Sequence, residues 1–269
     1  MAAPLPDPES IASLLPRPLG LFSDVDGTLS PIAPTPGAAS LSSTVLGLLE
    51  ALAAAGVLVA LLSGRRAQEL RRWVGLEGVV YVGNHGLEWW EGGRVRTVPG
   101  LARYRRLART ALAELGRLEL PGLLLEDKEV GVAVHYRLSP SPEAAREAVL
   151  AAIAASPACR SFWVLEGKMV LELRPPLGAD KGTAALDLAR RHRLRGALAL
   201  GDDITDVPMF RRLRRAPGLR AVCVAVAGPE TPPLVLQLAH YRVEGVEGVE
   251  TLLRGLLRAF APGSPPTGP

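Results

Sequence analysis

The sequence predicts an α/β protein, with a Rossmann-like core built on a parallel sheet and a smaller α+β domain inserted into that core. Three observations support this fold class. Short apolar runs alternate with amphipathic segments near both ends of the chain, which is the pattern of parallel strands joined by helices. In the middle of the chain the order changes to helix, hairpin, helix and hairpin. Acidic residues directly follow two of the apolar runs, as in ligand sites at the carboxyl ends of parallel strands.

The first part of the chain alternates buried strands with helices. The expected strands are 19–22, 57–62 and 79–82. The expected helices are 41–55 and 67–74. Each helix has apolar residues at helical spacing and stops at a glycine, Gly56 or Gly75, the residue type most common just past a helix C-terminus. This order of strands and helices predicts a parallel sheet with helices on its faces.

The same alternation returns in the last part of the chain. The expected helices there are 181–191, 207–213 and 249–260, and the expected strands are 196–200 and 219–226. The middle segment is predicted to contain helices at 101–115 and 142–155, and hairpins formed by 122–126 with 130–138 and by 162–165 with 169–173. We therefore expect a catalytic core at 1–100 and 177–269, with a cap domain for substrate specificity at 101–176.

The composition is that of a globular protein with a full core, because 48% of the 269 residues are apolar and 22% are charged. The net charge of +4 permits nucleic-acid binding without favouring it, and aromatic residues, at 4%, leave little material for stacking on bases. The two cysteines, Cys159 and Cys223, form no CxxC pair. They suit a reducing cytoplasm and exclude a disulfide framework.

No segment of the sequence is typical of export or membrane insertion. Residues 1–10 lack the basic and apolar regions of a signal peptide. The longest apolar stretch, 46–62, contains Glu50 and Gly56 and fits a helix followed by a strand better than a membrane span. We expect a cytoplasmic protein with no membrane partner and no nucleic-acid partner. The sequence leaves the oligomeric state open.

Lysine is rare in this chain. Of the 31 basic residues, only Lys128, Lys168 and Lys181 are lysines. So strong a preference for arginine is typical of a GC-rich genome. A lysine retained against that preference therefore predicts a functional role.

Five aspartates follow two of the predicted strands: Asp24 and Asp26 after the first, and Asp202, Asp203 and Asp206 after 196–200. Like charges this close together disfavour ionisation or require a cation, and no lysine or histidine at these two strand ends supplies a full counter-charge. Oxygen ligands with positions left for water and phosphate favour Mg²⁺. The alternative interpretation, turn and helix-capping residues, explains one Asp-Gly turn better than two acidic clusters.

The order DxDGT, Ser63, Lys181 and GDDxxD resembles the haloacid dehalogenase superfamily. The resemblance implies phosphoryl transfer through an aspartyl-phosphate. It implies that Asp24 is the nucleophile and that Asp26 is the general acid and base, a role that requires Asp26 to hold a proton near neutral pH. Ser63 would donate a hydrogen bond to a phosphoryl oxygen, and Lys181 would neutralise charge there and on Asp24.

The same resemblance implies a Mg²⁺ site and a phosphate cradle. The ion would be held by Asp24, by the main-chain carbonyl of Asp26 and by Asp202, while Asp203 and Asp206 would orient its waters or its ligands. Gly27 would let the main-chain amides turn toward the phosphate.

The middle segment is expected to select the substrate. Its charged clusters at 126–128, 135–137, 166–168 and 172 offer donors and acceptors suited to sugar hydroxyls, although any one of them alone is more typical of a solvated hairpin. Together with DxDGTLxPI, SGR, GNHG and DKG, these clusters resemble the trehalose-6-phosphate phosphatase family. The resemblance implies a hydrolase of trehalose biosynthesis that acts on trehalose 6-phosphate, a small-molecule sugar phosphate. The substrate-binding residues that it implies are Gly27, Asn84, His85, Glu126, Lys128, His135, Arg137, Lys168 and Glu172.

Several alternatives remain at this point. Asn84 and His85 are equally typical of a strand end with a structural role. The substrate is alternatively sucrose phosphate, mannosylglycerate phosphate or a related ester, and a phosphomutase or phosphotransferase would pass the phosphoryl group to a sugar instead of to water. A nucleic-acid-binding protein with an inactive phosphatase core is a further alternative, against which the complete motif set argues.

Overall fold

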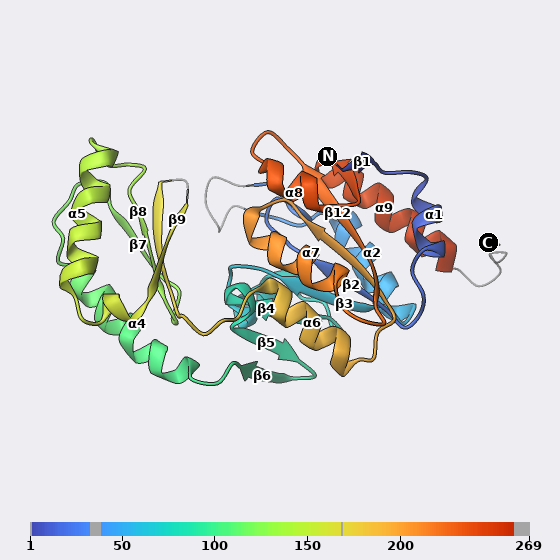
Figure 1. Cartoon of the computed structure of the whole chain (residues 1–269), viewed down its shortest axis with the longest axis horizontal. Coiled ribbons are helices and arrows are strands. Elements are labelled where there is room, and N and C mark those ends of the chain that lie inside the picture. The colour runs from blue at the N-terminus through green and yellow to red at the C-terminus, as the bar shows by residue number, and fades with distance from the viewer. Residues whose placement is uncertain (1, 33–38, 168, 261–269) are drawn as a thin grey trace. The chain divides into compact units, whose positions relative to one another are not determined.

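The computed structural model describes residues 2–32, 39–167 and 169–260. The chain divides into two compact units, which are unit 1, Met1–Arg96 with Ala179–Pro269, and unit 2, Thr97–Gly178 (Figure 1). Each unit has its own apolar core. The limits 101–176 for a cap domain, and the role of that domain in substrate selection, stay predictions.

Unit 1 is built on one nine-stranded sheet. Its strands lie in the order β1 (Ala3–Pro4), β13 (Tyr241–Glu244), β12 (Arg220–Ala227), β11 (Gly196–Gly201), β2 (Leu19–Ser23), β3 (Leu58–Leu62), β4 (Val80–Gly83), β5 (Glu88–Glu91) and β6 (Arg94–Thr97). The strands from β1 to β4 in this order pair in parallel, whereas β5 runs antiparallel to β4. The sequence therefore predicts the parallel sheet correctly.

Two layers of helices cover the two faces of this sheet (Figure 1). One layer contains α1 (Pro8–Ser13), α2 (Ser43–Ala54), α3 (Ala67–Val74) and α9 (Gly245–Phe260). The other contains α6 (Lys181–Arg191), α7 (Val207–Arg214) and α8 (Pro233–Leu238). Alternate residues of a strand point to opposite layers, so Val59 and Leu61 pack in the first core while Ala60 and Leu62 pack in the second.

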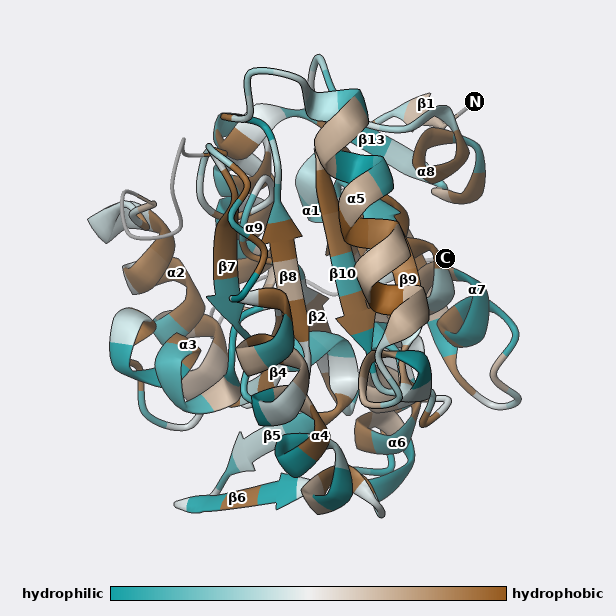
Figure 2. Cartoon of the chain, turned by 90° about the vertical axis from the view of Figure 1, so that its left-hand side faces the viewer, coloured by the Kyte–Doolittle hydropathy of each residue, from teal (hydrophilic) through white to brown (hydrophobic). Residues whose placement is uncertain are grey.

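Unit 2 contains a four-stranded antiparallel sheet and two helices. Its strands lie in the order β7 (Leu124–Asp127), β8 (Val132–His135), β10 (Val170–Arg174) and β9 (Trp163–Gly167). Its helices are α4 (Leu101–Leu115) and α5 (Pro142–Ala155). The helices pack on the sheet face that carries Val132, Val134 and Leu171, and the polar residues that interrupt the apolar strands (Figure 2) fall at the alternate positions.

Most predicted elements form where they are expected, and the differences have local causes. The helices at 67–74, 101–115, 142–155 and 181–191 have the predicted bounds. The last helix begins at Gly245 instead of at residue 249. Gly245 and Gly248 lower the intrinsic helix propensity of these first residues, so the sequence does not show where the helix starts, and packing requires glycine within the helix. A Cβ on Gly248 would lie 2.8 Å from Val243, and one on Gly255 would lie 2.4 Å from Pro8.

The sequence reading missed the short elements β1, α1, β5, β6, α8 and β13. It also extended a strand over 130–138, where β8 ends at His135. The Tyr136 N–H still donates to the carbonyl of Met169, in register with β10, but the Tyr136 carbonyl accepts from the Ser139 N–H in a turn, and the strand ends there. In the described ranges no helix combines the length and the apolar character that crossing a bilayer requires.

Candidate active site

The polar residues predicted for catalysis lie at the carboxyl ends of three adjacent strands. Strands β11, β2 and β3 pair in parallel, and each is followed directly by a motif residue, Asp202, Asp24 or Ser63 respectively. Neighbouring parallel strands end at the same edge of a sheet, so these three side chains lie together. The Asp24 N–H donates to the carbonyl of Leu200, which ties the end of β2 to that of β11.

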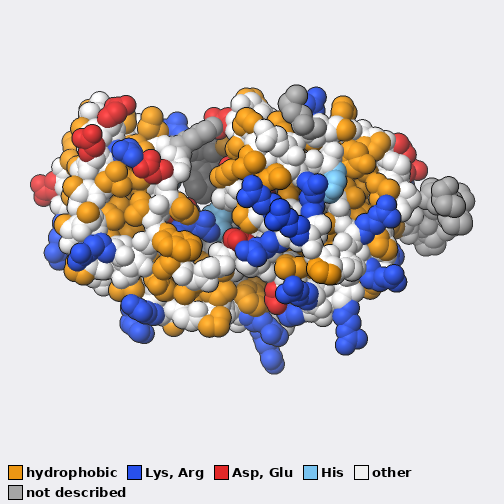
Figure 3. All heavy atoms as spheres, viewed as in Figure 1, with side chains coloured by type: hydrophobic (Ala, Val, Ile, Leu, Met, Phe, Trp, Pro, Cys, Tyr) orange, Lys and Arg blue, Asp and Glu red, His pale blue; other side chains and the backbone are white. Residues whose placement is uncertain are grey.

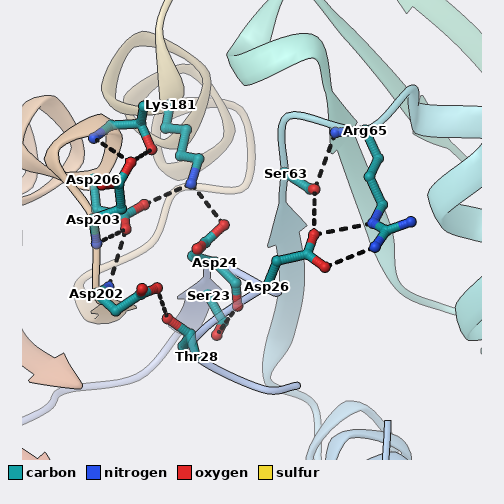
Figure 4. Close-up of polar contacts among 11 residues, drawn as sticks. Ser23, Asp24, Asp26, Thr28, Ser63, Arg65, Lys181, Asp202, Asp203 and Asp206 are labelled. Carbon is teal, nitrogen blue, oxygen red and sulfur yellow. Dashed lines mark hydrogen bonds and ion pairs between the residues drawn. The ribbon is translucent and has the colours of Figure 1, made fainter. Parts of the chain in front are cut away.

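Asp24, Asp202 and Asp206 form a buried acidic group that is joined by Lys181 (Figure 4). Carboxylate oxygens of the three aspartates lie within 4.8 Å of one another. The Lys181 Nζ donates to Asp24 Oδ1 at 2.6 Å and to Asp206 Oδ1 at 2.7 Å. Lys181 is 2% exposed, and it reaches the group from the first residue of α6. The counter-charge that the two strand ends lack is therefore supplied in part by a helix.

Burial controls the ionisation of this group. It raises the pKa of Asp24 well above its usual value, Asp206 and Asp202 raise it further, and the Lys181 ammonium opposes the rise. Burial, together with the charge of Asp206, raises the pKa of Asp202 from 3.8 to about 6, against a hydrogen bond from Thr28. Burial alone would lower the pKa of Lys181, but Asp206 and Asp24 reverse this effect and raise it. Three carboxylates held by one ammonium are thus short of positive charge.

The acidic group fits a hard divalent cation. With all four groups ionised, the three carboxylates and the ammonium carry a net charge that one divalent ion balances. Lys181 uses Oδ1 of Asp24, and Thr28 Oγ1 donates to Oδ1 of Asp202 at 2.9 Å. The other oxygen of each of these two carboxylates is not used by these bonds. An all-oxygen donor set of this kind is the one that Mg²⁺ prefers.

Asp206 serves the group mainly by positioning its other members. Its Oδ2 accepts hydrogen bonds from the main-chain N–H groups of Asp202 and Asp203, both at 3.1 Å. The Asp203 carboxylate turns instead to Thr205, whose hydroxyl donates to Asp203 Oδ2 at 3.1 Å. Asp203 is also the N-cap residue of the 3-10 helix η4 (Ile204–Asp206). Of the predicted metal residues, Asp24, Asp202 and Asp206 are thus brought together, and the Asp203 side chain lies outside the group.

Two glycines make the close approach of the carboxylates possible. A Cβ on Gly27 would lie 2.3 Å from Asp202 Oδ2, and Gly27 has φ +93°, a backbone conformation that favours glycine. A Cβ on Gly201 would lie 2.4 Å from the carboxyl carbon of Asp206. Both sites therefore require a residue without a side chain.

The side chain of Asp26 points away from the acidic group, toward Arg65 and Ser63 (Figure 4). Arg65 Nε donates to Asp26 Oδ2 at 3.0 Å and Arg65 Nη2 donates to Oδ1 at 2.7 Å. Ser63 Oγ donates to the same carboxylate at 3.5 Å and accepts from the Arg65 main-chain N–H at 3.1 Å. Such a two-bond pair with a guanidinium fixes the direction of the Asp26 carboxyl group.

Arg65 and Thr28 are the site residues that the sequence reading missed. Both stand inside motifs that it used, SGR and DxDGT, so the signal was available but was assigned no role. The Arg65 guanidinium lies 4.3 Å from the ring centroid of Trp73, which fixes it in a cation–π contact. Its side chain is 11% exposed.

Asn84 and His85 lie directly beside the Ser63 loop. They form the 3-10 helix η2 (Asn84–Gly86), and their main-chain N–H groups donate to the carbonyls of Arg65 and Ser63. Both residues have positive φ, 48° and 54°, which costs energy for any residue with a side chain. The Asn84 amide nitrogen is buried with no hydrogen-bond partner among the described residues. The strained turn therefore holds the side-chain N–H group of Asn84 in a buried position without giving it a hydrogen-bond partner among the described residues.

Three of the residues predicted for sugar binding in unit 2, Glu126, Lys128 and His135, form one linked cluster. Glu126 Oε1 lies 2.6 Å from Lys128 Nζ, and Glu126 Oε2 lies 3.1 Å from His135 Nε2. The hydrogen bond with His135, aided by Lys128, lowers the pKa of Glu126 to about 2 despite partial burial. Glu172 pairs in register with Ala133, which is also opposite Glu126. Arg137 follows the end of β8 and is exposed, and Lys168 lies outside the described residues.

The comparisons with known proteins agree on one family. The family model for trehalose-phosphatase matches residues 22–233. A trehalose-phosphate phosphatase of Mycobacterium avium is 37% identical over 212 residues, covering 73% of this chain and 52% of its own. One of Mycobacterium tuberculosis is 35% identical over 236 residues, covering 83% of this chain and 55% of its own. The chain thus spans about half the length of these curated relatives.

Solved structures show the same fold. The C-terminal domain of Candida albicans trehalose-6-phosphate phosphatase matches with a TM-score of 0.74 at 22% identity, covering 96% of this chain and 98% of that one. An Aspergillus fumigatus trehalose-6-phosphate phosphatase matches with a TM-score of 0.66 at 25% identity, covering 96% of this chain and 100% of that one. The predicted haloacid dehalogenase type of α/β fold is confirmed by these matches. On its sequence match and on its fold together, the chain belongs to the trehalose-phosphatase family.

Proposed function

We propose that this chain is a Mg²⁺-dependent phosphatase of trehalose biosynthesis that hydrolyses trehalose 6-phosphate to trehalose and phosphate through an aspartyl-phosphate. The observation that carries the proposal is the buried Asp24 carboxylate at the end of β2, bonded to Lys181 and close to Asp202. The family match, and the printed names of the relatives, support the substrate. Free buried cysteines, Cys159 and Cys223, support a cytoplasmic location.

In the first step, a carboxylate oxygen of Asp24 forms a bond to phosphorus while the bond from phosphorus to the sugar oxygen breaks. Asp26 gives a proton to the leaving sugar oxygen. Lys181 holds Asp24 in place and neutralises charge on the phosphoryl group, and Ser63 donates a hydrogen bond to a phosphoryl oxygen. In the second step Asp26 takes a proton from water, whose oxygen attacks phosphorus, and the bond to Asp24 breaks to release phosphate.

Arg65 fixes the direction in which Asp26 points. The paired arrangement holds the Asp26 carboxyl group beside Ser63. We infer that this is the resting arrangement of the general acid and base. Arg65 is then a positioning residue for the general acid and base.

Mg²⁺ would be held by Asp24 and Asp202, with the main-chain carbonyl of Asp26 and with Asp206 and Asp203 arranging the site around it. When bound, the ion would polarise the phosphoryl oxygens and supply the positive charge that the acidic group lacks. This charge would also favour the ionised form of Asp24, which the nucleophilic role requires.

The sugar would be bound by the face of the unit 2 sheet opposite its helices. Glu126, His135 and Glu172 occupy alternate positions on that face, judged by the pleat and by the strand register. Their carboxylates and ring nitrogens suit the many hydroxyls of a disaccharide. On the next strand Leu165 is in register with Glu172, so an apolar surface for a sugar ring lies beside the acceptors.

The test is phosphate release from a panel of sugar phosphates with Mg²⁺ present. Trehalose 6-phosphate is expected to have a kcat/KM at least about tenfold above sucrose 6-phosphate, mannosylglycerate phosphate and glucose 6-phosphate. Equal values across the panel would reject the trehalose assignment and leave a general sugar-phosphate phosphatase. Transfer of phosphate to a sugar, detected by product analysis, would indicate a phosphotransferase instead.

A further inference from the structure

A cavity of about 510 Å³ lies on unit 1 between α6 and α7, and arginines line it. Those used here are Arg190 from α6 and Arg211, Arg212 and Arg215 from α7 and its end. Figure 3 shows the basic side chains gathered over these helices. Asp180 is the only acidic residue that lines the cavity among the described residues.

The positive charge of this arginine pocket is largely uncompensated. Arg212 Nη2 lies 3.3 Å from Asp180 Oδ2. The Asp180 carboxylate also caps the N-terminus of α6, where it accepts a hydrogen bond from the Thr183 N–H. In the part of the chain that the structure describes, Arg190, Arg211 and Arg215 have no carboxylate within ion-pair distance. Some arginines of unit 1 outside the pocket do pair with carboxylates, as Arg71 does with Glu77 and Arg191 with Glu91 and Asp187.

The guanidinium groups that line the pocket indicate what kind of ligand it would bind. Each presents a planar fork that matches two oxygens of a phosphate group. Four forks around one cavity offer more donors than a single phosphate group can accept, and the volume is within the range of about 300–1,000 Å³ that small-molecule sites occupy. A flat basic surface for a long polyanion would need no cavity.

We propose that the arginine pocket binds a small anion that carries two or more phosphate groups, such as an inorganic polyphosphate or a nucleotide. The pocket contains none of the aspartates of the acidic group, so its ligand is independent of the catalytic assignment. The shared feature of these ligands is a short row of phosphate groups, and the experiment separates the sources by comparing tripolyphosphate with ATP.

The test is isothermal titration calorimetry of the full chain with tripolyphosphate, in EDTA at fixed ionic strength so that no divalent ion binds either partner. One site is expected for the unmodified chain. The triple variant Arg190→Gln, Arg211→Gln and Arg215→Gln should bind on the order of a hundredfold more weakly, because it loses several charge-assisted hydrogen bonds. Thermal melting checks that the variant remains folded, as expected for exposed side chains.

A matched control separates a built pocket from general basic charge. The triple variant Arg109→Gln, Arg220→Gln and Arg254→Gln removes the same charge from exposed positions that do not line the pocket, and it should bind tripolyphosphate within about threefold of the unmodified chain. Equal weakening in both triple variants would overturn the proposal, because binding would then follow net charge alone. Full binding by the pocket variant would overturn it too, since the anion would then occupy the catalytic site.

Two further ligands complete the test. Orthophosphate should bind at least about tenfold more weakly than tripolyphosphate, because it meets fewer of the forks. ATP binding as tight as that of tripolyphosphate would identify a nucleotide as a source, and weaker binding would identify inorganic polyphosphate. Binding of a single-stranded oligonucleotide without binding of either small anion would overturn the proposal in favour of a nucleic-acid surface.

Discussion

Arg65 holds both carboxylate oxygens of Asp26, with Nε 3.0 Å from Oδ2 and Nη2 2.7 Å from Oδ1. The pair joins the loop after β2 to the loop after β3, and stacking of Arg65 on Trp73 fixes its position. The sequence identified Asp26 by its motif. Only the structure identifies Arg65 as the residue that fixes the direction of the Asp26 side chain.

We expect Arg65→Ala to lower kcat for phosphate release by about tenfold, with KM changed much less, because Asp26 loses its fixed orientation. Steady-state kinetics with trehalose 6-phosphate measure both constants. Arg65→Lys should recover part of the loss, and Arg66→Ala is the matched control on the neighbouring residue. An unchanged kcat in Arg65→Ala would remove the positioning role.

Asp24→Asn should abolish turnover, because a neutral amide is a poor nucleophile toward phosphorus. The expected loss is on the order of ten-thousandfold or more, measured as phosphate release with the purified variant. Thermal melting serves as the control for folding. Turnover close to that of the unmodified chain would refute Asp24 as the nucleophile.

Removal of divalent metal should stop the reaction. EDTA is expected to abolish phosphate release, and an excess of Mg²⁺ should restore it fully, because the acidic group lacks positive charge without the ion. Asp202→Asn should need a higher Mg²⁺ concentration for half-maximal activity. Activity that survives exhaustive chelation would contradict the metal site.

The metal-free protein should lose stability as the pH rises from about 4 to about 6. Asp202 has a folded-state pKa of about 6, against 3.8 ordinarily. The folded state therefore binds this proton more tightly than the unfolded state does. The resulting stabilisation is complete below the unfolded-state pKa of 3.8 and is lost as the pH rises through the folded-state pKa of about 6. The effect is on the order of 3 kcal/mol, measured by urea unfolding in EDTA at several pH values. Asp202→Asn should reduce this dependence and leave the part due to Asp24, whose pKa burial also raises. An unchanged slope in that variant would contradict the assignment to Asp202.

Lys181→Arg should reduce kcat by at least about a hundredfold, although the charge is kept. Lys181 is buried and its ammonium contacts two carboxylates, so a larger planar group does not fit the same space. Lys128→Arg is expected to raise KM instead, and Arg254→Lys, on the exposed side of α9, should change neither constant. Full activity in Lys181→Arg, Lys128→Arg and Lys168→Arg alike would show that the rarity of lysine carries no functional information.

The backbone of unit 1 was largely predictable because its signals are local. Strands β2, β3 and β11 are continuous apolar runs buried on both faces, and each ends at a polar motif. By contrast, β5 places a buried Glu88 and two tryptophans in four residues, a pattern with no clear period. The Glu88 carboxylate accepts a hydrogen bond from the N–H of Ala67, the first residue of α3, a partner that lies 21 residues away in the sequence.

The candidate site was predictable in its membership and not in its internal bonds. Motif order places Asp24, Ser63 and Asp202 at one edge of the sheet. The direction of Asp26 toward Arg65, and of Asp203 toward Thr205, depends on side-chain rotamers that no spacing rule specifies. The same holds for Glu126, whose partners Lys128 and His135 were predicted as separate sugar ligands and prove to be bonded to it.

The bond between Lys181 and Asp24 also bears on how the protein folds. It joins residues 157 apart in the chain, and the whole of unit 2 lies between them. Closing so long a loop from an unfolded chain is entropically costly and slow. Unit 2 has its own core, so we expect it to fold early and shorten the loop that remains. The Lys181 ammonium would then reach its carboxylates only late in folding, so we expect recovered activity to be the last signal of refolding.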